Sequence, residues 1–511
     1  MAQQTYSANL SAATFPMLFR DATRSIIIKG PDQTFAPVID SKSDQDRNAS
    51  IPQMLYCHNV LPTSYGYSSI TFKKVIEFPG SLQGSFDDLK LIRSSTGAKA
   101  YITLTDQGKL YITQPPLYRW IYVTGSSTYI GKKLTVAYVD GKSYIYIATV
   151  GCFLYDFSTN TLLPQSLTGL TLADIQGVVA SSGYLLCWSN TALYWSSSID
   201  VTDFTPSLLT GAGGGNVQSA EGNITFCKPA LQGILVHTLS NVIYFNYTAN
   251  SRFPFSANAP VVGAGGCALD RYTAADSSSA SYYMYGTSGL QLLNTRLAQN
   301  VYPEVTDFIS GFYFEDFDYA TNEFTFRALQ VQLLRSLTLV ASRYLVVSYG
   351  ITELTHAIVI DLIQKRFGKI KFTHTICFEF EDLSSPVSNS TTDSIALLSP
   401  TGDVYTVKLA DITTECDSVA IFGKYQYVRS RVLQLHSIEV ENVQYESNFQ
   451  LGLLSAIDGK NYSTQILTNI THSGLLYKAN MRVTALNFAV LFKGNFNANS
   501  LLLVYSIGGS R

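Results

Sequence analysis

The chain has 511 residues, which is enough for about two to four domains. Charged residues make up 14% of it, against about 25% in average globular chains, and the formal net charge is −2. The sequence has no block of Lys and Arg residues, which excludes a protein that grips nucleic acid or anionic lipid through clustered positive charge.

No stretch approaches the roughly 18 apolar residues that a membrane-spanning helix needs, and the polar segment Met1–Leu10 lacks the apolar core of a secretory signal. We therefore expect no membrane-spanning segment. Aromatic residues make up 13% of the chain. Because aromatic side chains fit a pleated, half-buried surface, the composition favours an all-β fold.

Residues 1–59 lack the regular hairpins of the later chain and include the polar run Asp40–Ser50. A polar run of this kind cannot bury enough apolar surface to form a core. We expect an N-terminal arm or a small domain with a flexible loop.

Short alternating runs separated by turn residues dominate the middle of the chain. Lys99–Tyr111, Leu134–Thr149 and Ser394–Leu409 each contain two such runs around a turn with glycine. In the second, the turn is Asp140-Gly141, a pair that favours a tight hairpin because both turn positions prefer positive φ. Each of these segments is predicted to be an antiparallel hairpin.

Strand-rich blocks recur along residues 60–420, and the first four of them start about 40 residues apart. The blocks begin near Leu134, Ile175, Gly222, Ala264, Ala341 and Ser394. The longer gap from Tyr302 to Phe326 has room for one more unit. This spacing is typical of a β-propeller, in which four-stranded blades bury one another and leave only short, protected edges. No Trp-Asp or kelch signature accompanies it.

The segment Glu353–Phe367 has two interpretations. Leu354, Ile358 and Leu362 lie on one face of an amphipathic helix. The β-branched residues that follow Ala357, and the alternation after Phe367, favour strand, turn and strand instead. We prefer the second interpretation.

From residue 421 to 511 the apolar runs become longer, and we predict a separate C-terminal β-sandwich there. Hairpin turns are expected at Asp458-Gly459 and Ser473-Gly474. The expected strands are Tyr425–Asn442, Phe449–Ile457, Met481–Phe492 and Leu501–Ile507.

Cysteines and histidines are spaced in a way that does not indicate a metal or redox site. The closest two cysteines are 35 positions apart, and no Cys-x-x-Cys, His-x-His or His-Glu-x-x-His motif occurs. We expect reduced thiols that act as small apolar core residues. The residues concerned are Cys57, Cys152, Cys187, Cys227, Cys267, Cys377, Cys416, His58, His237, His356, His374, His436 and His472.

Three further motifs predict structural roles and not catalytic or ligand-binding ones. The run Gly211–Asn216 lacks the Lys-Ser/Thr and the helix of a phosphate-binding loop, so we predict a structural loop. Glu315, Asp316 and Asp318 are expected on a solvated strand face, with a calcium or sugar contact as the alternative. Ser455–Tyr462 resembles the Asp-box of sialidases, but a single copy is most simply a hairpin. We therefore predict no enzyme, no cofactor, and no catalytic, cofactor-binding or metal-ligating residue.

The order of several short motifs from Ala192 onward is similar to a known family. The motifs are Ala192-Leu193-Tyr194-Trp195-Ser196-Ser197, Asp203-Phe204-Thr205-Pro206-Ser207, Thr210-Gly211-Ala212-Gly213, Gly222-Asn223-Ile224, Leu231-Gln232-Gly233 and Asn241-Val242-Ile243-Tyr244. They resemble the segment that links two blades in the tail nozzle (tail tubular) proteins of short-tailed bacteriophages.

Scattered matches extend this resemblance from about Asn59 to the C-terminus. They are Asn59-Val60-Leu61-Pro62-Thr63 with Gly66-Tyr67, Val359-Ile360-Asp361-Leu362 with Lys365-Arg366-Phe367-Gly368-Lys369, and Gly494-Asn495-Phe496 with Asn499-Ser500-Leu501. The chain is shorter than the better-known members, which is consistent with the absence of insertion domains.

The resemblance implies a structural virion protein of the phage tail, made in the host cytoplasm. Such proteins form a homo-oligomeric ring, usually a hexamer, below the portal and its head-to-tail adaptor. The ring extends the channel for DNA ejection and docks tail fibres or spikes. DNA would pass through without specific binding, in line with the lack of basic runs.

Two other functions compete with this one. A glycan-binding or glycan-cleaving β-propeller, such as a receptor-binding protein, would bring carboxylates together at one mouth of the propeller. A propeller scaffold for other proteins in a cell would show no such cluster.

Overall fold

The computed structural model of the protein describes strands and their connections over most of the chain. Nearly every regular element that it describes is a β-strand, and η3 (Leu172–Asp174) and η4 (Asp270–Tyr272) are short 3₁₀ turns. The predicted all-β fold is confirmed. The described residues are 4–9, 26–28, 54–63, 66–80, 84–115, 118–123, 129–230, 232–275, 282–286, 289–302, 305, 313–318, 323–328, 334–381, 383, 394–410, 416–427, 432–442, 448–456 and 463–507.

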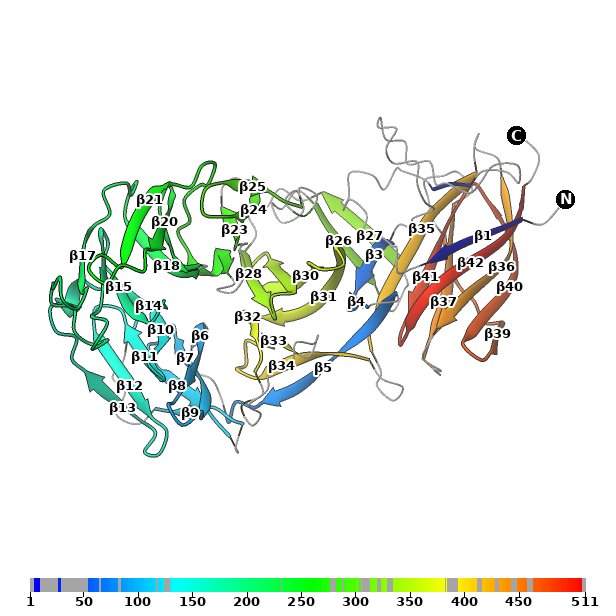
Figure 1. Ribbon diagram of the computed structural model, residues 1–511. Helices are drawn as coiled ribbons and strands as arrows, with labels where there is room; N and C mark the ends of the chain where they lie inside the picture. The colour runs from blue at the N-terminus through cyan, green and yellow to red at the C-terminus, as the bar shows by residue number, and fades with distance from the viewer. Residues whose placement is uncertain are drawn as a thin grey trace.

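Five antiparallel sheets of four strands follow one another along the chain, and in each of them every strand pairs with the next in sequence (Figure 1). The strands are β6–β9 (Phe86–Arg93, Lys99–Thr105, Leu110–Thr113, Ile121–Tyr122), β10–β13 (Leu134–Val139, Lys142–Ile147, Gly151–Asp156, Thr161–Gln165), β14–β17 (Gly177–Ser181, Tyr184–Trp188, Ala192–Trp195, Gly213–Asn216), β18–β21 (Ile224–Ala230, Gly233–Thr238, Val242–Tyr247, Phe255–Pro260) and β22–β25 (Thr273–Ala275, Tyr282–Gly286, Gly289–Leu293, Ala298–Asn300).

Two further groups of four strands belong to a 14-stranded sheet. One is β28–β31 (Leu334–Val340, Tyr344–Gly350, Leu354–Asp361, Arg366–His374), and the other is β32–β34 (Ile376–Glu379, Ile395–Leu398, Val404–Leu409) together with β5 (Tyr67–Ile76). The outermost strand of the last group thus comes from the N-terminal part of the chain: Leu409 pairs with Ile70, and Val404 with Ile76. These two groups and the five sheets are called the seven strand groups below.

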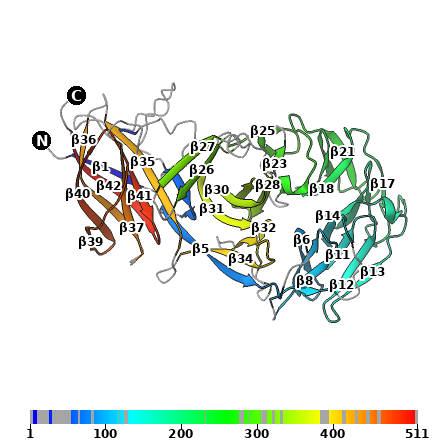
Figure 2. The ribbon, with the colours of Figure 1, turned by 180° about the vertical axis from the view of Figure 1, so that it is seen from behind.

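The first strands of successive groups lie side by side. In chain order they are β6, β10, β14, β18, β22, β28 and β32, and β32 lies beside β6 again (Figures 1 and 2). Buried apolar clusters lie between neighbours. One contains Ile102 of β7 and Ile145 of β11, and another contains Tyr101 of β7 and Leu398 of β33. Each group therefore buries a face against the group next to it.

The chain from Val419 onward forms two further sets of paired strands, called the C-terminal sheets. The first contains β36 (Leu433–Asn442), β39 (Ile470–Ser473), β40 (Leu476–Ala485), β42 (Asn497–Ile507) and β1 (Gln4–Asn9); the second contains β35 (Val419–Tyr427), β37 (Gln450–Ala456), β38 (Ser463–Ile466), β41 (Asn487–Lys493), β2 (Ile26–Ile28) and β3 (Met54–His58). The described strands of residues 1–59 therefore pair with C-terminal strands: β1 with β42, and β2 and β3 with β35. The first of the C-terminal sheets is the remainder of the 14-stranded sheet, in which β42 pairs with β5.

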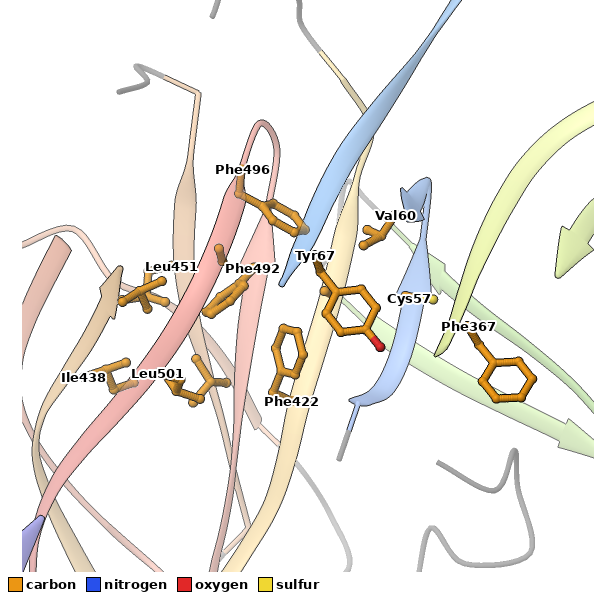
Figure 3. Close-up of a cluster of buried hydrophobic side chains, with 14 of the residues drawn as sticks. Cys57, Val60, Tyr67, Phe367, Phe422, Ile438, Leu451, Phe492, Phe496 and Leu501 are labelled. Atoms are coloured by element: carbon orange, nitrogen blue, oxygen red, sulfur yellow. The ribbon is translucent and has the colours of Figure 1, made fainter. Parts of the chain in front are cut away.

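One apolar core joins the strand groups to the C-terminal sheets (Figure 3). Tyr67 of β5 lies against Phe422 of β35 with ring centroids 6.0 Å apart, and Phe422 lies 5.0 Å from Phe492 of β41. Val60 of β4 (Val60–Pro62) and Phe367 of β31 belong to the same buried cluster. Because β4 and β5 also pair with each other, the segment from β3 to β5 holds the two parts together.

The local sequence predictions are largely confirmed. The three predicted hairpins are β7 with β8, β10 with β11, and β33 with β34, and Asp140 and Gly141 have φ of 51° and 70° at the second of these turns. The segment Glu353–Phe367 forms β30, a turn and the start of β31, as the strand interpretation predicts. The turn at Ser473-Gly474 joins β39 to β40.

Some predicted boundaries are wrong. Tyr425–Asn442 and Met481–Phe492 are not single strands, because in each segment the chain crosses from one C-terminal sheet to the other. Neither segment contains the glycine or proline that would mark such a break in the sequence. The predicted turn at Asp458-Gly459 and most of the Asp-box-like segment lie outside the described residues.

The predicted starts of the repeating units are wrong in part. The group β6–β9 precedes the first predicted start at Leu134, and the last two groups begin at Leu334 and Ile376 rather than near Ala341 and Ser394. The gap from Tyr302 to Phe326 contains, in its described part, the two-stranded hairpin of β26 (Tyr313–Asp318) and β27 (Glu323–Ala328).

Candidate interaction site

The connection between β16 and β17, from Trp195 to Gly213, is held in shape by its own hydrogen bonds. The indole Nε1 of Trp195 donates to the Gly211 carbonyl at 2.8 Å, and the backbone N–H of Ser198 donates to the Thr210 carbonyl at 2.9 Å. Gly211 has φ of 74°, a left-handed conformation that glycine adopts without strain. The two ends of the connection are therefore tied to each other.

The same connection also contacts the strand groups before and after its own. The backbone N–H of Phe204 donates to the Thr168 carbonyl at 2.9 Å, and the Phe204 side chain is buried. Gly211 lies so close to the Ser251 carbonyl that an added Cβ would stand 2.2 Å from its oxygen. The connection thus ties together three neighbouring groups, β10–β13, β14–β17 and β18–β21.

Large apolar side chains on this ordered connection point to solvent. Ile199 is 80% exposed and Leu209 87% exposed, and the neighbouring Leu208 and Phe253 are also mostly exposed. Single exposed apolar residues are ordinary, whereas several on two adjacent, ordered loops make a candidate interaction surface. We call these four residues the apolar rim patch.

The glycine-rich run that ends the connection is a strand and not the predicted loop. Gly213–Asn216 forms β17, the edge strand of its group, and pairs with β16. The next regular element is another strand, β18, so no helix N-terminus stands behind the run to receive a phosphate.

Four charged side chains from β6, β18 and η4 lie together. Lys90 Nζ of β6 lies 2.9 Å from Asp88 Oδ1 and 3.5 Å from Asp270 Oδ2 of η4, and Lys228 Nζ of β18 lies 2.5 Å from Asp270 Oδ1. Burial alone would raise the pKa of Asp270, but Lys228 and Lys90 outweigh it and hold that pKa well below its usual range. Two aspartates and two lysines thus balance one another.

His237 and His374, which belong to no metal-binding motif, are buried and neutral. Burial lowers the pKa of His237 to about 3 and that of His374 to about 4. His374 Nε2 lies 2.8 Å from the Ser348 hydroxyl, and its Nδ1 lies 2.7 Å from the Phe372 carbonyl oxygen. These rings serve packing and hydrogen bonding between strands.

The cysteines are free thiols, and six of the seven are buried. Burial raises the pKa of Cys152 and of Cys377 to about 12, so both stay protonated at neutral pH. Within the described residues, no three His, Cys, Asp or Glu side chains are grouped so as to hold a metal ion. The side chains of Glu315, Asp316 and Asp318 lie outside the described part of the chain, and their expected solvated face stays a prediction.

The chain was compared with protein-family models and with curated proteins. No family model matches the chain, and no curated protein matches it either. Among the described residues, no helix is long and apolar enough to cross a membrane.

Proposed function

We propose that this chain is a structural protein of a bacteriophage virion, the subunit of a tail nozzle ring. In this proposal the seven strand groups form a β-propeller, the C-terminal sheets form a β-sandwich beside it, and copies of the chain assemble into a closed ring, with six copies as the family resemblance implies. The observation that carries the proposal is the apolar rim patch on the segment from Trp195 to Gly213, which is the same segment that carries the resemblance.

The propeller part of the proposal is supported by how the groups pack. A four-stranded sheet with two apolar faces has to cover both of them, and face-to-face neighbours around an axis do so. Tyr101 and Leu398, from the first and last groups, share one buried cluster. The last group takes its fourth strand, β5, from the N-terminal side, which joins the two ends of the array.

Assembly with further copies is supported by the surface. Ile199 and Leu209 lie on a connection that hydrogen bonds already hold in place, so little conformational entropy is lost when a partner covers them. The low charge content and the many aromatic residues suit protein–protein contacts, whose cores are depleted in charge. A patch on one copy that meets a different surface on the next copy gives a heterologous contact, which closes into a ring when the rotation allows it.

The place of the ring in the particle follows from the resemblance. It would lie below the portal and adaptor, extend the channel for DNA ejection and dock tail fibres or spikes. A channel lining should let DNA slide, and a chain with net charge −2 and no basic run suits that task. No covalent chemistry is part of this function.

Electron microscopy of the purified chain, alone and with a portal–adaptor complex, tests the proposal. We expect rings with an axial channel. Leu209→Asp and Ile199→Asp should shift the rings to monomers, whereas Ile363→Asp, at a residue 72% exposed in the turn after β30, should not. A wild-type chain that stays monomeric beside the complex would overturn the proposal. Specific binding to a glycan array would favour the receptor-binding alternative.

A further inference from the structure

The four-residue charge cluster joins strands that are not neighbours. Lys90 lies on β6, which packs beside β10 and β32, whereas Lys228 lies on β18, which packs beside β14 and β22. Two whole groups, β10–β13 and β14–β17, separate these strands along the chain. Asp270 forms ion pairs with both lysines, so these contacts link β6 and β18 directly and not through the groups between them.

Asp270 is placed for this role by the backbone around it. It opens the short turn η4, and the Thr273 hydroxyl donates to its carbonyl at 3.0 Å, which ties the turn to the start of β22. Its carboxylate uses one oxygen for Lys90 and the other for Lys228. The neighbouring Arg271 also acts electrostatically on Asp87 of β6, a second attraction between the same two elements.

The cluster is neutral as a whole and partly desolvated. The four side chains are 24–40% exposed, so water screens their attraction in part but not fully. Burial opposes the charge on Lys90, yet Asp88 and Asp270 outweigh it and raise the pKa of Lys90. Lys90 and Asp270 are therefore charged at neutral pH. Burial raises the pKa of Asp88 above its usual value, against the opposing effect of Lys90.

We propose that Asp88, Lys90, Lys228 and Asp270 form an ionic brace across the axis of the proposed propeller. The brace ties β6 to β18 and η4. The inference rests on the proposed function, because the axis is the one around which the strand groups of the proposed propeller pack.

A double-mutant cycle on the purified chain tests the brace. The variants are Lys90→Met, Asp270→Asn and the two together, and the readout is hydrogen exchange of the backbone amides of β6 and β18. We expect each single variant to raise the exchange rate of these amides about twofold or more over wild type. The factor for the double variant should be smaller than the product of the two single factors, as for residues in contact. Added salt should reduce the difference from wild type.

The matched control is the partly exposed pair Lys478 and Glu439 in the C-terminal sheets, with Lys478 Nζ 2.6 Å from Glu439 Oε1. Lys478→Met and Glu439→Gln should leave exchange in β6 and β18 unchanged. Effects of Lys90→Met and Asp270→Asn that simply multiply, or no effect of either, would overturn the brace.

The brace and the proposed function fail in different experiments. If purified chains form no ring, the nozzle proposal fails while the exchange result still stands. If rings form but the exchange effects are absent or simply multiply, the brace is wrong and the nozzle proposal stands.

Discussion

A single substitution in the C-terminal sheets should destabilise the strand groups as well. Phe422 of β35 is completely buried and lies against Tyr67 of β5 and Phe492 of β41. Replacing it with alanine removes the ring and leaves a cavity in the core that both parts share, which costs about 3–5 kcal/mol of unfolding free energy. Because β5 also completes the last strand group, we expect the loss to reach the whole array.

The chain contains its own reporters for this experiment. Its three tryptophans, Trp120, Trp188 and Trp195, all lie in strand groups, so fluorescence during urea denaturation follows that part alone. Phe422→Ala should lower the fluorescence midpoint clearly. Ile363→Ala, at a residue 72% exposed in the turn after β30, is the control and should change the unfolding free energy by less than about 0.5 kcal/mol.

Independent unfolding of the strand groups and the C-terminal sheets would give a different result. If Phe422→Ala accelerates hydrogen exchange in β41 but leaves the tryptophan midpoint unchanged, the two parts unfold independently. The shared core drawn in Figure 3 would then not couple the stability of the strand groups to that of the C-terminal sheets.

Three other perturbations have defined outcomes. His237 and His374 stay neutral in the folded state, with pKa values of about 3 and 4, so the unfolded state takes up protons first as the pH falls. The unfolding free energy measured in urea titrations should therefore fall by up to about 1.4 kcal/mol per histidine per pH unit from about pH 6.5 to 4. Equal stability at pH 7 and pH 5 would contradict this. Gly141→Ala, at φ of 70°, should cost about 1 kcal/mol in thermal unfolding, and an unchanged midpoint would argue against the tight turn. Trp195→Phe leaves the Gly211 carbonyl without its indole donor and should cost about 1 kcal/mol; an unchanged melting temperature would show that this hydrogen bond does not hold the connection.

Much of the local structure could be predicted from the sequence, because hairpins depend on residues that are close along the chain. Alternation of apolar and polar residues specifies a strand, and a pair such as Asp140-Gly141 specifies the reversal that follows it. The same alternation cannot specify which sheet a strand joins. Between Tyr425 and Asn442 the chain changes sheets with no change in pattern, so one long strand was expected there.

The candidate site was less predictable, for two physical reasons. Apolar residues such as Ile199 and Leu209 are expected to be buried, and only the folded structure places them on the outside of an ordered connection. Lys90 and Asp270 are 180 positions apart, and no short motif marks residues that meet from such distant parts of the chain. The segment from Trp195 to Gly213 was singled out by resemblance, whereas its contacts with three strand groups come from the structure.

The pairing of the N-terminal strands has a consequence for folding. β1, β3 and β5 pair with β42, β35 and β34, strands that follow them by more than 300 residues. Closing loops of that size is slow relative to hairpin formation, so the local strand groups should form first. The N-terminal strands then dock on edges that exist only once the C-terminal half is folded. The step that closes the array of strand groups is therefore also the step that attaches it to the C-terminal sheets, because β4 and β5 take part in both.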